Sequence, residues 1–522
     1  MKKKYIFTGL LGLLTLGMTS CMDQLEIDQH GVLDYNTYYQ TDEDAEAAIT
    51  AVYLQQRGLS YNYLMGKNCL CDDYWAGGAT RGDNAAFEQL NEFTFTAEQD
   101  QLQGMFESYY QIIYKCNVVL GHVGEETPVM KRARAEAKVF RAWAYFELTS
   151  MWGNPPVVDH ELTASEYQRP NGSTEELWAL VENDLNEAIQ SGDLTQKNGA
   201  DDKSNWRVTK QFAQALLGKA LLWQGKNAEA AKAFDEVINS GLYRLYDGNY
   251  EDILQYTAKW NCESLFESNH VVDTDNLFDN WDFTGAMTRW RLEKFDMTAE
   301  FKAKYQTGQD YGFLSPTKSL YDEFVKEEGE NGYRLTQTMK TLDQMKELGA
   351  TLSSGKTVIA EGYFFWKWRT TTEDSPAAGY GFVYCNNFRW MRLAEVYLCA
   401  AEAHLAAGNA SKAAEYVNKV RTRAKLSSKS SVTLKDIQTE KRLELCGEGT
   451  RYQDIQRWGL AYDLMKDQGK NCPILQSNGQ VEYKVYNNDA SLYGFKKGKH
   501  ELLPYPDTEI RLNKAIKQNP GW

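Results

Sequence analysis

Residues 389–424 read RWMRLAEVYLCAAEAHLAAGNASKAAEYVNKVRTRA, and their pattern decides the fold class. Apolar and small side chains recur every three to four residues in both halves of this stretch, which is the spacing of amphipathic helices. Gly408 and Asn409 lie between the halves, and such a pair predicts a helix stop. Two amphipathic helices joined by so short a turn must lie antiparallel and bury their apolar faces together.

Small residues dominate the surfaces that these two helices would share. The alanines in question are Ala400, Ala401, Ala403, Ala413 and Ala414. Methyl-sized side chains let two helix backbones approach closely, which is the packing of tetratricopeptide repeats. The same layout occurs earlier, in AQALLGKALLWQGKNAEAAKAFDEVINSG at 213–241, where the alanines and the central glycine recur at matching offsets. The chain therefore carries an internal repeat with large insertions between its units.

Other helical segments extend this pattern towards the amino terminus. Thr41, followed by three acidic residues, and Ser173 or Thr174, followed by two glutamates, are predicted helix caps. The predicted antiparallel pairs are 45–58 with 106–123, 132–153 with 174–192, the two halves of 213–241, and the two halves of 389–424.

Between 243 and 387 the helical period is lost, and only short elements are expected there. Residues 315–329 are predicted as a helix and 362–369 as a strand. The predicted fold is mostly α, a tetratricopeptide-like scaffold of about four helical pairs with a large loop-rich insertion that carries short strands and helices.

Charge and composition narrow the classes of partner. The 522 residues include 57 basic and 72 acidic ones, giving a formal charge of -15, which argues against nucleic acid or an anionic membrane surface as the partner. Aromatic residues make up 13% of the chain. They must either fill the core or be displayed, and large aromatic groups are displayed mainly where a protein binds something.

The first twenty residues have the order of a secretory signal with a lipidation site. Lys2 to Lys4 precede a short apolar run, and the small residues Thr19 and Ser20 stand directly before Cys21. We predict that residues 1–20 are a signal peptide and that Cys21 carries the lipid anchor. Met18 is a less usual residue three positions before such a cysteine, so ordinary signal-peptidase cleavage and an uncleaved anchor remain alternatives.

The remaining cysteines and the histidines give no indication of a metal or cofactor. Eight cysteines follow Cys21, without a CxxC pair, and the six histidines form no spaced cluster. Few or no disulfides are predicted. No phosphate-binding loop, dinucleotide fingerprint or nucleophile elbow occurs, so no cofactor is predicted.

Four separated motifs resemble one known family. They are AEAKVFRAWAYFELTSMWGNPPVV at 135–158, RLAEVYLCAAEA at 392–403, EKRLELCGEGTRYQDIQRW at 440–458 and QNPGW at 518–522. Their order resembles the SusD/RagB family of outer-membrane nutrient-binding lipoproteins. The resemblance implies that 21–241 is a SusD-like N-terminal region and that 242–522 holds the loop-rich binding region and the C-terminal region, interleaved in one globular body.

The resemblance also implies a function and a location. A protein of this family would be anchored by lipid to the cell outer membrane, face the exterior, bind oligosaccharides or polysaccharide, and deliver them to a SusC-like TonB-dependent transporter. Asp23, Glu26 and Asp28 are similar to the acidic export signal of such lipoproteins. The alternatives are a peptide cargo, which some relatives take up, and a glycoside hydrolase with an unrecognised site.

Two segments supply the predicted ligand-binding residues. The first is the glycine-rich stretch 68–96, which lacks a helical period, and the second is 270–295. In the family, an acidic and aromatic element near the first segment contributes to the ligand site, and indole faces beside amides and carboxylates suit a sugar. The alternative is that these aromatic residues only pack the loops and the core. The candidates are Asp72, Asp73, Tyr74, Trp75 and Arg81, and then Asp279, Asn280, Trp281, Arg289 and Trp290.

A row of glutamates tests the hydrolase alternative. Glu440, Glu444 and Glu448 are spaced four apart, so they lie on one side of a helix. The nearby charges Arg442, Arg451, Asp454 and Arg457 almost balance them. We therefore predict a structural ion-pair network rather than an acid–base pair with separated pKa values, and no catalytic activity.

Overall fold

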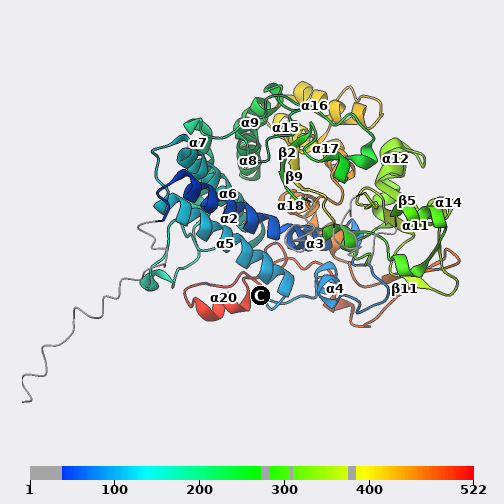
Figure 1. Ribbon diagram of the computed structural model, residues 1–522. Coiled ribbons are helices and arrows are strands. Elements are labelled where there is room, and N and C mark those ends of the chain that lie inside the picture. Colours follow the sequence, from blue (N-terminus) through cyan, green and yellow to red (C-terminus); the bar gives the residue numbers. More distant parts are fainter. Residues whose placement is uncertain (1–37, 272–282, 306–309, 374–383) are drawn as a thin grey trace, which may run out of the picture.

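The computed structural model describes residues 38–271, 283–305, 310–373 and 384–522. Its architecture is mostly helical, as predicted (Figure 1). The helical pairs occupy the left and upper parts of the view, and the short elements of the insertion occupy the right. Among the described residues, none of the helices combines the length and the apolar composition needed to cross a bilayer.

The first two predicted pairs are present. Helix α2 (Asp42–Gly58) packs against α5 (Asp100–His122), and α6 (Pro128–Trp152) packs against α7 (Thr174–Ser191). The Thr41 hydroxyl accepts a hydrogen bond from the Asp44 backbone at 3.1 Å, and Ser173 does the same for Glu176 at 3.1 Å. Both are capping boxes, because the acidic side chain accepts in return from the cap residue's own backbone.

The repeated pairs are also present and lie side by side. They are α8 (Lys210–Trp223) with α9 (Asn227–Asn239) and α15 (Leu393–Ala406) with α16 (Ala410–Arg423). Each short turn holds a glycine at positive φ, Gly225 at 74° and Gly408 at 85°, a conformation that glycine adopts without strain. Helices α9 and α15 pack against each other, so two segments far apart in sequence form one continuous helical stack.

The prediction of an irregular loop over 68–96 was wrong in part. Helix α3 (Ser60–Cys69) runs into this stretch and α4 (Ala85–Glu92) lies within it. The Asn84 side chain accepts from the Phe87 backbone at 3.1 Å and caps α4, whose buried face includes Phe87 and Leu90. Eight residues with so few apolar positions are too short for the helical period to be recognised.

The insertion between 243 and 387 consists of short elements, as predicted. Its helices are α10 (Thr284–Thr288), α11 (Ala299–Tyr305), α12 (Lys318–Glu328), α13 (Tyr333–Thr338) and α14 (Leu342–Glu347). Helix α12 confirms the prediction for 315–329. The strand expected over 362–369 is confirmed only for its start, because the backbone amides of Trp366 and Lys367 both donate to the Thr338 carbonyl and turn the chain.

The strands of the described residues form small antiparallel sheets. The strands are β1 (Tyr74–Trp75), β2 (Ser264–Ser268), β3 (Phe295–Met297), β4 (Ser315–Pro316), β5 (Met339–Thr341), β6 (Ala350–Leu352), β7 (Thr357–Val358), β8 (Tyr363–Phe365), β9 (Phe388–Arg392), β10 (Cys472–Gln476) and β11 (Val481–Lys484). They pair as β1 with β4, β2 with β9, β3 with β6, β5 with β8, and β10 with both β7 and β11. Most of these pairs join distant parts of the sequence, and β9 leads directly into α15.

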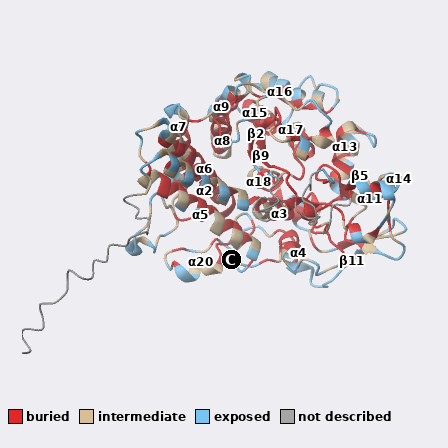
Figure 2. Cartoon of the chain, viewed as in Figure 1, coloured by how far each residue is buried: buried red, intermediate tan, exposed pale blue. Residues whose placement is uncertain are grey.

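Helices α17 (Leu434–Glu444), α18 (Arg451–Arg457), α19 (Ala461–Met465) and α20 (Asp507–Leu512) complete the chain. Figure 2 shows buried residues concentrated inside the helical stack and around α3 and α18, with exposed residues at the periphery. One large apolar core runs through the helical pairs, and a smaller one fills the insertion. The eight cysteines from Cys69 to Cys472 are buried free thiols.

Candidate functional site

Asp72 and Asp73 do not line a surface that a ligand could reach. Arg451 donates to both carboxylate oxygens of Asp72, at 2.8 and 2.9 Å, and Arg442 donates to Asp73 at 2.7 Å. Burial alone would raise the pKa of Asp72, but the two guanidinium groups outweigh it and lower that pKa to about 2. Cys71 could share a cation with these carboxylates on distance alone, yet the arginines already neutralise them. The pair is therefore part of the scaffold.

The other candidates of the first segment, Tyr74, Trp75 and Arg81, also make contacts that stabilise the fold. Tyr74 is buried against Phe365, with 5.1 Å between ring centroids, and Trp75 is half-buried in β1. Arg81 pairs with Glu88 at 3.2 Å and with Glu92, which fastens its loop to α4. Of these three, Trp75 and Arg81 keep some exposed surface.

Arg289 and Trp290 were expected to be displayed to a ligand, but the structure buries both. The Arg289 side chain is buried and donates to Asp310 at 2.7 Å and to the Thr370 carbonyl at 2.9 Å. Trp290 is only 2% exposed and stacks on Trp366 with ring centroids 5.7 Å apart. Their neighbours in sequence did not predict these partners, since Asp310 and Trp366 come from other segments. The remaining candidates, Asp279, Asn280 and Trp281, lie outside the described residues.

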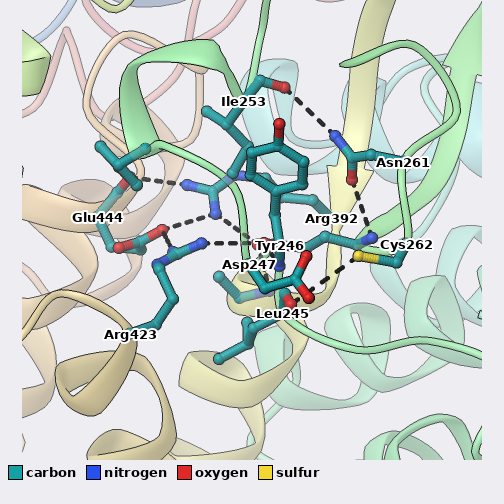
Figure 3. A network of polar contacts seen from close by, with 12 residues as sticks. Leu245, Tyr246, Asp247, Ile253, Asn261, Cys262, Arg392, Arg423 and Glu444 are labelled. Carbon is teal, nitrogen blue, oxygen red and sulfur yellow. Dashed lines mark hydrogen bonds and ion pairs between the residues drawn. The ribbon is translucent and has the colours of Figure 1, made fainter.

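The predicted ion-pair network is confirmed, although its partners differ from those expected. Arg392 pairs with Glu263 at 2.6 Å, with Glu444 at 2.6 Å and with Glu448 at 2.7 Å. Arg423 adds a second guanidinium to Glu444 and pairs with Glu263 at 3.0 Å, and Figure 3 shows both arginines converging on Glu444. These arginines come from β9 and α16, and Glu263 belongs to the insertion, so the network ties the insertion and the repeat to α17.

The arginines that the sequence suggested as partners act elsewhere. Arg442 and Arg451 neutralise Asp73 and Asp72, whereas Arg457 pairs with Glu402 at 2.5 Å. The third glutamate, Glu440, pairs instead with Arg334 of α13 at 2.7 Å. Helix α17 ends at Glu444, so Glu448 lies beyond the helix on which the sequence placed all three glutamates. The spacing predicted that the charges are structural but could not identify partners from distant segments.

The protonation of this network argues against acid–base chemistry. Burial alone would raise the pKa of Glu444, but the guanidinium groups of Arg423, Arg392 and Arg334 outweigh it and hold the pKa far below its ordinary value. The pKa of Glu448 is lowered in the same way by Arg392 and Lys367. Both carboxylates are therefore ionised, and a general acid requires one of two carboxyl groups to keep its proton.

A different group of side chains forms a partly exposed aromatic cluster on the edge of the large core. Tyr61 of α3, Phe283 just before α10, and Tyr311 form what we call the aromatic row, with adjacent ring centroids 5.9 and 6.1 Å apart. All three rings are half-buried. Phe313 stacks on Tyr311 at 5.6 Å, and Phe87 packs against Tyr61 at 6.2 Å, so buried rings support the row on the side of the core.

Charged groups accompany the aromatic row. The Arg291 guanidinium lies 5.3 Å from the centroid of the Tyr311 ring and pairs with Asp83 at 3.0 Å. Asp83 also accepts from the Ala79 backbone at 2.8 Å, which holds its loop beside the row. Sequence reasoning selected none of these residues, although Phe283 and Arg291 lie within 270–295 and Asp83 lies within 68–96. Nothing in the local sequence links Tyr61 with Tyr311, because the fold alone brings them together.

Comparisons with known proteins agree with this architecture. A SusD-like family model described as starch-binding and associating with the outer membrane matches residues 32–222, and a SusD family model matches 330–522. SusD-like protein P25 of Formosa agariphila is 23% identical, over 96% of this chain and 95% of its own length. A SusD-like protein of Bacteroides ovatus is 25% identical, over 100% of this chain and 98% of its own.

Solved structures extend the agreement to three dimensions. A laminarin-binding SusD-like protein superposes with a TM-score of 0.77 and is 28% identical, covering 93% of this chain and 100% of that one. Its match spans both the helical pairs and the insertion. Motif order, helical pairing and these matches lead to one conclusion, that the chain belongs to the SusD family.

Proposed function

We propose that this protein binds oligosaccharides or polysaccharide at the aromatic row and delivers them to a SusC-like TonB-dependent transporter. The observation that carries the proposal is the row itself, in which Tyr61, Phe283 and Tyr311 follow one another at 5.9 and 6.1 Å with Arg291 and Asp83 alongside. The similarity to a laminarin-binding SusD-like protein supports it.

The chemistry of the row suits a sugar. The C–H faces of a pyranose ring stack on flat aromatic rings, and its hydroxyl groups need donors and acceptors at the ring edges. Arg291 supplies donors, and Asp83 supplies acceptors. Since the rings are already held by Phe313 and Phe87, little conformational entropy is lost when a ligand stacks on them.

We further propose that the protein is not an enzyme. The carboxylates that most resemble a catalytic pair are Glu444, which is buried among arginines, and Glu448, which is paired with Arg392 and Lys367, and both have lowered pKa values. Neither can hold a proton for transfer at neutral pH. Release of reducing ends from a bound polysaccharide by the purified protein would contradict this part of the proposal.

Replacing the tyrosines of the row tests the site. Tyr61→Ala and Tyr311→Ala should each weaken binding about 5- to 10-fold, which corresponds to about 1 kcal/mol for one lost stacking contact. Affinity electrophoresis in gels that contain laminarin, starch or xylan measures the change. Tyr167→Ala removes an exposed tyrosine from the segment after α6 and serves as the control.

Two results would refute the site or the ligand class. If both tyrosine variants fold normally and are retarded like the parent, the row is not the site. If the parent ignores all three polysaccharides but binds extended peptides, the cargo is a peptide and the ligand class is wrong.

The location is proposed separately from the ligand. We infer a lipid anchor at Cys21 and an outward-facing position at the outer membrane, on the strength of the basic, apolar and small-residue order before that cysteine. Metabolic labelling with palmitate should mark the parent and leave Cys21→Ala unlabelled. Equal label on both would place the anchor elsewhere.

A further inference from the structure

Trp206 is the one tryptophan that the described part of the chain displays to solvent. It is 41% exposed, whereas the other described tryptophans are buried or half-buried. It stands shortly before Thr209, which caps α8. Because leaving an indole in water forgoes the free energy of burying a large apolar surface, a displayed indole beside a hollow indicates a contact site.

The neighbours of Trp206 hold its ring in a fixed position. The Arg207 guanidinium lies 4.3 Å from the ring centroid, and Tyr53 meets the ring edge-on at 5.5 Å. Arg207 is in turn paired with Glu136 at 2.9 Å and with Glu46. An aromatic platform that is already immobilised loses little entropy when a ligand stacks on it.

The ring borders a groove of about 250 Å³ between α2 and the segment that follows β2. Leu54 of α2 and Val271 form apolar walls and are 50% and 44% exposed. Arg57, which donates to the Asn269 carbonyl at 3.5 Å, brings a guanidinium to the same groove. A hollow of this size suits a short part of an extended ligand rather than a whole drug-sized molecule.

The groove is close to the aromatic row. Arg57 stands at the end of α2, and Tyr61 is in the first turn of α3, four residues later. Four residues of backbone span at most about 14 Å, so a polymer lying along the junction of α2 and α3 can touch both places. Continuity of this kind favours a single chain-like ligand over two unrelated ones.

We propose that the Trp206 groove is a second contact for the same polysaccharide chain that occupies the aromatic row. This inference rests on the proposed function and adds that the protein prefers long chains. A carbohydrate fits better than a peptide, because β2 is buried along its whole length and its backbone is therefore poorly accessible to a pairing peptide strand. The indole face and Arg57 offer stacking and hydrogen bonding instead.

Chain length is the variable that tests the second contact. When two contacts belong to one chain, the second forms at a high effective concentration, so only chains long enough to reach both gain affinity. Trp206→Ala should weaken binding of polymeric laminarin about 10-fold, while binding of laminaritriose changes less than about 2-fold. Trp206→Phe keeps a flat ring and should lose less than about 3-fold.

The experiment uses isothermal titration of the purified protein with laminarin and laminaritriose, or with starch or xylan and the matching trisaccharide if the parent prefers those. Tyr311→Ala is run alongside and should weaken binding of both lengths. Leu54→Ser alters the groove wall from an exposed position and provides a second variant if Trp206→Ala fails to fold. Circular dichroism melts confirm that each variant is folded.

The outcomes separate this inference from the function on which it rests. If Tyr311→Ala weakens binding but Trp206→Ala and Leu54→Ser bind polymer like the parent, the second contact is refuted and the aromatic row stands. Equal losses for polymer and trisaccharide in Trp206→Ala would also refute it, because the indole would then belong to the first contact. A parent that binds none of the three polysaccharides overturns both proposals.

Discussion

The ion-pair network around Glu444 and the aromatic surface around Tyr311 and Trp206 contain residue types that both suit a binding site, yet the fold uses them in opposite ways. Glu444 is 0% exposed, and its oxygens are occupied by arginines from three other segments. Tyr311 is half-buried, and Trp206 is 41% exposed. Burial and partners, rather than residue type, separate the scaffold from the site.

The two regions should also differ in what a mutation costs. Burying a charge is expensive unless it is paired, so removing one member of a buried pair leaves the other with no compensation. A displayed aromatic side chain contributes little to folding and gains its value only when a ligand covers it. Stability and binding should therefore respond to different substitutions.

The largest expected effect comes from Arg392→Ala. This change removes the cation shared by Glu263, Glu444 and Glu448 and should lower the free energy of unfolding by about 3–5 kcal/mol. Urea denaturation followed by circular dichroism measures it. Arg511→Ala is the matched control, since its pair with Asp507 is exposed and should contribute less than about 1 kcal/mol. Similar losses of stability in both variants would show that the buried network contributes no more to folding than an exposed ion pair does.

A smaller loss is expected from Trp290→Phe. Shrinking a side chain that stacks on Trp366 inside the smaller core leaves a cavity and should cost about 2 kcal/mol in urea denaturation. Binding of laminarin, starch or xylan should not change, because Trp290 is buried. A Trp290→Phe variant that is as stable as the parent but binds the polysaccharide poorly would indicate that Trp290 belongs to the ligand site.

Lowering the pH should reduce the stability that the ion-pair network around Glu444 contributes to the fold. The folded pKa values of Glu444 and Glu448 lie below those of the unfolded chain, so the unfolded chain takes up protons first as the pH falls. The stability that these carboxylates provide is complete above about pH 4.5 and is lost below it, by at most about 1.4 kcal/mol per pH unit for each group. Melting temperatures from pH 7 to pH 3 test this. In Arg392→Ala the melting temperature should fall less steeply with decreasing pH. An equally steep fall would show that other groups cause the loss of stability in acid.

The smallest effect on folding is expected from Trp206→Ala. Its ring is exposed and touches mainly Arg207 and Tyr53, so the free energy of unfolding should fall by about 1 kcal/mol or less. The same urea titration measures it. A loss as large as that of Trp290→Phe would show that Trp206 belongs to the core after all.

These contrasts explain which parts of the molecule sequence reasoning could predict. The helical pairs follow from a local period, and the caps at Thr41 and Ser173 follow from residues next to the helices, so both were predicted. Helix α4 was missed because the helix is too short for its apolar period to be recognised. The burial of Asp72 and Trp290 was not predicted, because it depends on partners that lie far away in the sequence.

The pairing of Asp72 with Arg451 also bears on how the chain folds. The two residues are 379 positions apart, so their contact closes a very long loop, whereas each helical pair can form from neighbouring segments. We expect the pairs to form early and this contact to form late. Until α17 and α18 dock, Asp72 and Asp73 lack their arginine partners and remain hydrated and negatively charged beside helices that have already formed. We therefore expect that Asp72 and Asp73, which are costly to bury in the folded protein, help to keep the partly folded chain soluble.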